Sequence, residues 1–156
     1  MSRLPTLILS ECVLIYTEAE VADHIMAWSS RACVDDVAWL LYEQINPEDA
    51  FGQIMLQNLR HRQIALPGIH ACPTLAAQEE RLHKHGFTTA HSMTLWDIWQ
   101  TQVRHPVGLA RVTPLEQLDE TEEFQLLLSH YCFTRGLRAR DDNVSSSWVN
   151  EEIRLS

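Results

Sequence analysis

A single acid at the end of a short apolar run is the strongest candidate for chemistry in this sequence. The run Leu7-Ile-Leu-Ser10 is followed by Glu11, and the chain returns to apolar residues before Tyr16. Such a run is typical of a buried parallel strand, and ligands of open α/β sheets bind beyond the carboxyl ends of the strands. Glu11 is therefore either a ligand-binding carboxylate at that edge or a solvated loop acid. Tyr16 either lines the same pocket or packs in the core.

A second apolar run, Val37-Ala-Trp-Leu-Leu41, also ends in polar residues, namely Tyr42, Glu43 and Gln44. A continuous run of this kind predicts a strand that is covered on both faces. Its carboxyl end faces the same edge of the sheet as Glu11. The three polar residues either contact a substrate or belong to the exit loop, as caps or as exposed side chains.

A helix must join these two strands, and residues 17–31 have the pattern for it. Thr17-Glu-Ala-Glu20 matches a capping box, and Val21, Ile25 and Trp28 recur at helical spacing, which predicts a buried face. Two parallel strands with one helix between them form a βαβ unit, which is almost always right-handed.

The rest of the chain predicts three more helices and two more strands. Asn46-Pro47 predicts the start of a helix that runs to about residue 63, buries Phe51, Ile54, Met55 and Leu59, and carries Arg60 on its polar side. An arginine there either pairs with a peptide carboxylate or belongs to a solvated helix face. A further helix spans about 74–85 and ends at Gly86.

Residues 87–95 predict a third strand, 97–102 a helical turn and 105–108 a loop. An acidic helix over 119–128 is expected to bury Phe124, Leu127 and Leu128, and 131–133 to begin a last, antiparallel strand. From Arg138 onward the chain is rich in Asp, Asn and Ser and lacks periodicity, which predicts a disordered tail over 138–156.

The composition excludes several classes of protein. The chain has 156 residues and a net charge of −9, and Lys84 is its only lysine, so it is a poor candidate for binding nucleic acid or an anionic membrane. No apolar run reaches bilayer length, and the N-terminus lacks a signal-peptide pattern, so we expect a cytoplasmic protein. Four scattered cysteines argue against a disulfide framework. His83-x-His85 and His70-Ala-Cys72 lack a third ligand at zinc spacing, so we predict no metal site.

Several blocks of this chain resemble the C-terminal half of leucine carboxyl methyltransferase. They are Leu9-Ser-Glu11-Cys-Val-Leu-Ile-Tyr16, Tyr42-Glu-Gln-Ile-Asn46, Phe51-Gly-Gln-Ile-Met55, Asn58-Leu-Arg60 and Leu118-Asp-Glu120 followed by His130-Tyr-Cys132. The tRNA wybutosine-synthesising methyltransferase is a sister branch that shares many of them.

The resemblance implies an α/β fold, the C-terminal half of a class I S-adenosylmethionine-dependent methyltransferase sheet of Rossmann-like type, with the last strand antiparallel. It implies a partial methyltransferase domain over 1–137 and Glu11 as a ligand of S-adenosylmethionine. It also implies methyl transfer to the C-terminal leucine carboxylate of the protein phosphatase 2A catalytic subunit. Tyr16, Tyr42, Gln44 and Arg60 are the candidate substrate-binding residues.

The sequence departs from the family in having no Gly-rich cofactor loop, so a non-catalytic remnant that binds a partner is an alternative. The tRNA-modifying branch is another. Methyl transfer to an ionised carboxylate needs no general base, and we therefore assign no catalytic acid or base.

Overall fold

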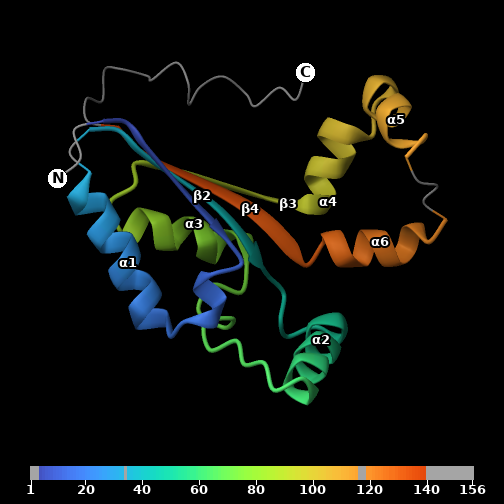
Figure 1. Ribbon diagram of the computed structural model, residues 1–156, viewed down its shortest axis with the longest axis horizontal. Coiled ribbons are helices and arrows are strands. Elements are labelled where there is room, and N and C mark those ends of the chain that lie inside the picture. The colour runs from blue at the N-terminus through green and yellow to red at the C-terminus, as the bar shows by residue number, and fades with distance from the viewer. Residues whose placement is uncertain (1–3, 34, 116–118, 140–156) are drawn as a thin grey trace.

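The computed structural model describes residues 4–33, 35–115 and 119–139. Its centre is one mixed sheet of four strands in the order β1-β2-β4-β3 (Figure 1). The strands are β1 (Thr6–Glu11), β2 (Val37–Gln44), β3 (Thr89–Thr94) and β4 (Tyr131–Arg138). The first two pair in parallel, and β4 runs antiparallel to both β2 and β3. The predicted α/β fold with an antiparallel last strand is confirmed.

Helices connect these strands throughout the described chain. They are α1 (Ala19–Ala32), α2 (Ala50–His61), α3 (Leu75–Lys84), α4 (Leu95–Ile98), α5 (Pro106–Val112) and α6 (Thr121–Leu128), with a 3-10 turn η1 (Leu14–Tyr16) and a π-helical turn η2 (Trp99–Val103). The loop predicted at 105–108 is wrong. Pro106 instead occupies the first turn of α5, where its missing N–H costs nothing.

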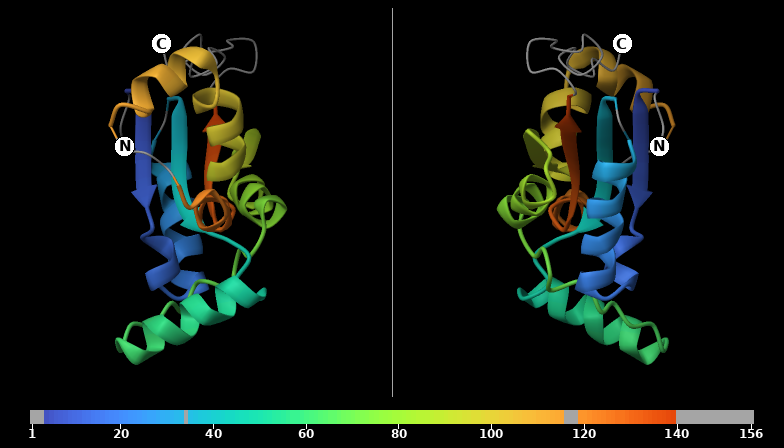
Figure 2. Two further views of the ribbon diagram at one scale, coloured as in Figure 1. Left: turned by 90° about the vertical axis from the view of Figure 1, so that its right-hand side faces the viewer. Right: turned by 90° about the vertical axis from the view of Figure 1, so that its left-hand side faces the viewer.

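The main core lies between the sheet and the two helices α1 and α3. Along β2 buried and half-buried residues alternate, and the buried set includes Val37, Trp39 and Leu41. These residues pack with Met26 of α1 and Leu82 of α3 in one apolar cluster. Figure 2 shows α1 lying along one side of β1 and β2. The prediction that β2 is covered on both faces is therefore wrong within the described chain, because its second row of residues remains half-buried.

The face of α1 that packs against the sheet differs from the predicted one. Val21, Ile25 and Trp28 are 48%, 39% and 65% exposed, whereas Ala22 and Met26 are fully buried. Ser29 is also buried, and its Oγ accepts a hydrogen bond of 2.9 Å from the indole of Trp39. The small side chains of Ala22 and Ser29 admit the large indole between helix and sheet, so the helix turns these residues inward.

The predicted start of α1 is also wrong. Its N-cap residue is Glu18, which makes no side-chain capping bond. The hydroxyl of Thr17 donates to the carbonyl of Leu14 instead of capping the helix.

The start of α2 also differs from the prediction. Its N-cap is Asp49 and not Asn46. The Oδ1 of Asp49 accepts a 2.8 Å hydrogen bond from the N–H of Gly52. A Cβ on Gly52 would lie 2.4 Å from the carbonyl oxygen of Asn46, so only glycine allows the incoming loop to pass this close. The helix therefore turns Gly52 and Leu56 inward.

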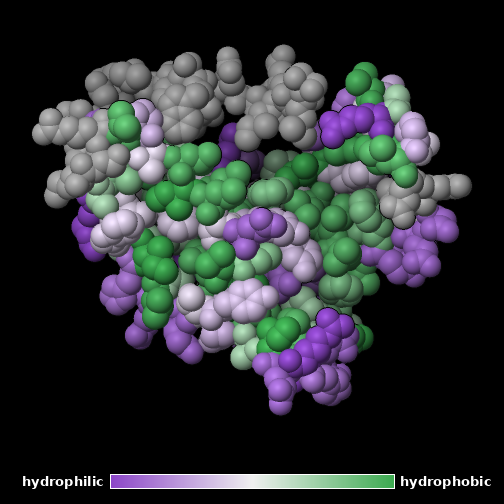
Figure 3. Space-filling model, in the orientation of Figure 1, coloured by the Kyte–Doolittle hydropathy of each residue, from purple (hydrophilic) through white to green (hydrophobic). Residues whose placement is uncertain are grey.

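The predicted apolar face of α2 is only partly buried: Phe51, Met55 and Leu59 are half-buried, and Met55 and Leu59 pack against a second apolar cluster that includes Leu56. Ile54 is 59% exposed, and Phe51, Met55 and Leu59 line a surface hollow with Ile54, Asn58 and Arg62. Figure 3 shows apolar surface directly beside hydrophilic surface at the position of α2.

Two expectations for the C-terminal part change as well. Leu127 of α6 is 45% exposed, whereas Phe124 is half-buried and packs edge to face on Trp99 at 5.0 Å between ring centroids. β4 continues to Arg138, so the boundary of the predicted tail lies inside the sheet. The rest of that predicted tail, residues 140–156, lies outside the described residues.

Candidate functional site

Glu11 and Tyr42 lie side by side at the carboxyl end of the parallel strand pair. They are register partners, and the next amide, that of Cys12, donates a 2.7 Å hydrogen bond to the carbonyl of Tyr42. Glu11 is exposed, and no hydrogen bond or ion pair joins its carboxylate to another described residue. The sheet therefore presents an accessible carboxylate at the edge where parallel strands bind ligands.

Tyr42 forms the aromatic part of this edge. Its ring stacks on Tyr131 at 5.3 Å and packs against Phe133 at 5.2 Å between ring centroids. Burial, and then the neighbouring Cys12 and Tyr131, raise the pKa of the Tyr42 phenol to about 12. The phenol is therefore neutral at physiological pH and can donate a hydrogen bond.

Gln44 lies on the same face of β2 as Tyr42, two residues further on. Its Nε2 donates a 2.8 Å hydrogen bond to the hydroxyl of Tyr131, which fixes the orientation of the amide. The Oε1 atom is buried and has no partner among the described residues. Tyr131 and Phe133 also belong to this edge, which the sequence alone does not predict. Their spacing of two in the last strand was the only available signal, and it does not say which strand they join.

Tyr16 lies at the end of η1, the turn that follows β1. Cys12 adopts a left-handed conformation with φ of 47°, and η1 then ends at Tyr16, which is 53% exposed. Burial raises the pKa of the Cys12 thiol to about 11, with further contributions from Glu43 and Glu11, so this cysteine is a protonated thiol and not a nucleophile.

Glu43 points to the opposite side of β2 from Tyr42 and Gln44 and is only 2% exposed. Its Oε1 accepts a 3.2 Å hydrogen bond from the N–H of Leu14, the first residue of η1. Of the two sequence interpretations, the loop-capping one therefore describes Glu43.

Arg60 is not part of this edge in the described structure. It lies exposed in the last turn of α2, where a positive charge complements the helix dipole, and no hydrogen bond or ion pair joins it to another described residue. Figure 1 shows α2 extending away from the sheet.

The histidines singled out by spacing have separate partners. The Nδ1 of His83 lies 2.9 Å from the carbonyl of Phe87, and Nδ1 of His70 lies 2.8 Å from Glu48. His85 pairs with Asp23 at 3.3 Å. Across the described ranges no three His, Cys, Asp or Glu side chains gather as a metal site would require. In the same ranges, no helix has both the length and the apolar character needed to cross a bilayer.

Comparison with known proteins gives the chain its relatives. No protein-family model matches it. Leucine carboxyl methyltransferase 1 of Rattus norvegicus is 39% identical over 138 residues, which cover 86% of this chain and 41% of that protein. The tRNA wybutosine-synthesizing protein 4 of Rattus norvegicus is 39% identical over 127 residues, covering 81% of this chain and 18% of that protein.

Among solved structures, one match is the Haemonchus contortus phosphoethanolamine N-methyltransferase 2 in complex with phosphomonomethylethanolamine and S-adenosylhomocysteine. It has a TM-score of 0.47 and 12% identity, and the match covers 86% of this chain and 33% of that one. The chain thus spans about two fifths of the length of the leucine carboxyl methyltransferases that it matches. Over most of its own length, the chain is similar to leucine carboxyl methyltransferases, with 37–39% identity to these relatives.

Proposed function

We propose that this chain contributes to methyl transfer from S-adenosylmethionine to the C-terminal leucine carboxylate of the protein phosphatase 2A catalytic subunit, as part of a longer methyltransferase. The observation that carries the proposal is the accessible Glu11 carboxylate beside Tyr42 at the carboxyl edge, in a chain related to leucine carboxyl methyltransferases. We place this activity in the cytoplasm.

The residues at this edge fit one end of the cofactor. Glu11 is an acceptor without a partner among the described residues, and the amino-acid end of S-adenosylmethionine carries an ammonium group that donates hydrogen bonds. When bound, the cofactor supplies a methyl group on a sulfonium. We assign to this chain the contact of Glu11 with the ammonium and no further cofactor contact.

The acceptor side requires orientation and no proton transfer. A C-terminal carboxylate has a pKa of about 3.3–3.7 and is ionised at neutral pH, so no base is needed to activate it. The neutral phenol of Tyr42 and the amide of Gln44 are suited to hold such a carboxylate by hydrogen bonds. We propose that these two residues and Tyr16 bind the acceptor, and that Arg60, on the exposed end of α2, contacts the partner away from this edge.

Two other functions compete with this one. Similarity to the tRNA wybutosine-synthesizing protein 4 supports a tRNA acceptor, whereas the net charge of −9 opposes it. A non-catalytic chain that binds a partner without cofactor is the second alternative. The accessible Glu11 favours the enzyme over this alternative.

Calorimetric titration of the purified chain with S-adenosylhomocysteine tests the proposal. We expect saturable binding that is weakened about tenfold or more by Glu11→Ala, because the loss of a charged hydrogen-bond partner costs about 1.5–3 kcal/mol. Glu80→Ala is the matched control, since Glu80 is an exposed acid on α3. A folded chain that does not bind S-adenosylhomocysteine would contradict the proposed cofactor role.

The acceptor is tested with labelled S-adenosylmethionine and two peptides of the phosphatase tail, one with a free C-terminal leucine and one amidated. We expect methylation of the free carboxylate only. Labelling of transfer RNA in place of the peptide would favour the tRNA branch. Peptide binding without labelling or cofactor binding would favour the non-catalytic partner-binding chain.

A further inference from the structure

A buried carboxylate lies directly beneath the turn that carries two of the candidate site residues. Glu43 is 2% exposed and is the penultimate residue of β2, on the face that α1 and α3 cover. Its Oε1 accepts the 3.2 Å hydrogen bond from the amide of Leu14, whereas its Oε2 is buried and has no hydrogen-bond partner among the described residues. The carboxylate therefore joins β2 to the first residue of η1.

The turn needs such an anchor because its backbone is unusual. Cys12 has a positive φ of 47°, which a residue with a side chain seldom adopts, and it lies between Glu11 and the turn η1. The β1–β2 pairing ends nearby with the bond from the Cys12 amide to Tyr42. Beyond that bond, the side chain of Glu43 is the part of β2 that is hydrogen-bonded to the turn in the described structure.

The surroundings of Glu43 disfavour an ionised carboxylate, so the buried charge reduces the stability of the folded chain. Burial raises its pKa to about 7, against a lowering by the Leu14 amide and by the charge of Arg81 on α3. The other titratable groups that face it are Cys12 in the turn, Cys132 on β4 and Cys72 in the loop before α3. A buried carboxylate is destabilising unless it is well bonded, so an apolar side chain would serve the core better.

We propose that Glu43 is a positioning residue: its buried carboxylate holds the amide of Leu14 and thereby fixes the turn that connects Glu11 to Tyr16. The consequence for ligand binding rests on the proposed function. The anchoring of the turn does not, because it depends only on the contacts between β2 and η1.

Hydrogen exchange on the full chain, followed by mass spectrometry, tests the anchoring. Glu43→Leu removes the acceptor and Glu43→Gln keeps one, with nearly the same shape. We expect Glu43→Leu to speed exchange in residues 13–15 by about tenfold, the effect of losing a hydrogen bond to a charged group, and Glu43→Gln to change it much less. Exchange in α3 serves as the internal reference. Unchanged exchange of the turn in a folded Glu43→Leu variant would overturn the proposal.

A second measurement covers the case in which Glu43→Leu fails to fold. In the unaltered chain, the amide resonance of Leu14 is expected to titrate near pH 7 in nuclear magnetic resonance spectra, and not to do so in Glu43→Gln. A Leu14 amide that does not follow this titration would contradict the anchoring.

Binding of S-adenosylhomocysteine separates this inference from the proposed function. We expect Glu43→Leu to weaken binding of S-adenosylhomocysteine, and Glu43→Gln to keep most of the affinity of the unaltered chain. Both effects would be indirect, because the side chain at position 43 acts through the turn and not by contact with the ligand. If the unaltered chain does not bind, the proposed function fails for this chain, while the exchange and resonance data still decide the role of Glu43.

Discussion

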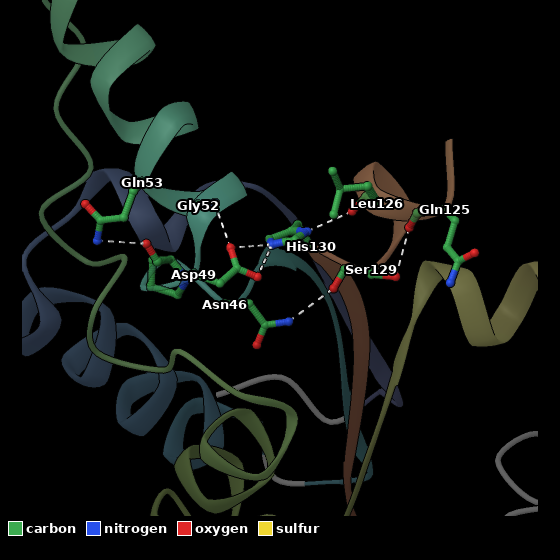
Figure 4. A network of polar contacts seen from close by, with 9 residues as sticks. Asn46, Asp49, Gly52, Gln53, Gln125, Leu126, Ser129 and His130 are labelled. Carbon is green, nitrogen blue, oxygen red and sulfur yellow. Dashed lines mark hydrogen bonds and ion pairs between the residues drawn. The ribbon is translucent and has the colours of Figure 1, made fainter. Parts of the chain in front are cut away.

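A single ring nitrogen of His130 lies within hydrogen-bond distance of both carboxylate oxygens of Asp49. Its Nε2 lies 2.9 Å from Oδ1 and 2.8 Å from Oδ2, and its Nδ1 lies 2.7 Å from the carbonyl of Leu126 (Figure 4). The ring also packs on Phe51 with 4.3 Å between centroids. This contact joins the start of α2 to the junction of α6 and β4.

Asp49 performs two functions that two substitutions can separate. It caps α2 through Gly52 and it pairs with His130. We expect Asp49→Ala to lower the free energy of unfolding by about 1–2 kcal/mol, as the loss of a cap does, and Asp49→Asn to lower it less, because asparagine also caps helices. Urea unfolding at pH 7 measures both. Equal losses would mean that the cap contributes little.

The pH dependence of the same pair has a defined sign. The hydrogen bond from Gly52 and then the pairing with His130 lower the pKa of Asp49 below 3.8, against an opposing effect of burial. The stabilisation is therefore present above pH 4 and lost as the pH falls through the lowered pKa. We expect the difference in unfolding free energy between the unaltered chain and Asp49→Asn to be smaller at pH 3 than at pH 7.

Glu43 predicts a pH dependence of the opposite sign. Its pKa is about 7 in the folded chain and 4.5 as an ordinary carboxyl, so the folded chain is destabilised as the pH rises from 4.5 through 7. We expect Glu43→Gln to gain up to about 3 kcal/mol of stability relative to the unaltered chain between pH 4 and pH 8. Thermal unfolding across that range measures the gain. A constant difference would show that Glu43 does not titrate in the folded state.

Asp23 of α1 forms ion pairs with α3, and these pairs should stabilise the folded chain except at low pH. Its carboxylate pairs with Arg81 at 3.0 Å and with Lys84 at 2.8 Å. Burial opposes its ionisation, but the hydrogen bond from Lys84 and the charge of Arg81 outweigh burial and lower its pKa to about 2. We expect Asp23→Asn to cost on the order of 1–2 kcal/mol at pH 7, and this loss to vanish as the pH falls from 4 to 2. A loss that persists at pH 2 would point to packing instead of charge.

The outer side of β1 predicts self-association. Leu7 and Leu9 are each 63% exposed, and β1 is paired only with β2 among the described strands. Exposed apolar edges favour pairing with another chain. We expect the sedimentation coefficient to rise with concentration, and the double variant Leu7→Lys and Leu9→Lys to remove the rise. Val107→Lys on α5, where the side chain is 76% exposed, is the control. An unaltered chain that sediments as a monomer at every concentration would contradict this prediction.

The sequence by itself determined which segments form strands and which form helices. The apolar runs before Glu11 and Tyr42 specify two strands, the residues between them specify a helix, and the end of α3 before Gly86 follows from glycine, whose φ is 90° there. These features depend on neighbours along the chain, so local patterns reveal them. The placement of Glu11 and Tyr42 at one edge follows from the same patterns, because parallel strands joined by a helix end together.

Only the tertiary structure decided which side of each element faces inward and which strands are neighbours. The sequence of α1 offers one stripe through Val21 and another through Ala22, and the indole of Trp39 selects the second by its bond to Ser29. β4 enters between β2 and β3, which brings Tyr131 next to Tyr42 and next to Gln44, 87 residues earlier in the chain. Likewise, nothing local distinguishes Glu43 from its neighbours Tyr42 and Gln44. Its burial against the amide of Leu14, 29 residues away, depends on long-range packing, which propensity and periodicity do not encode.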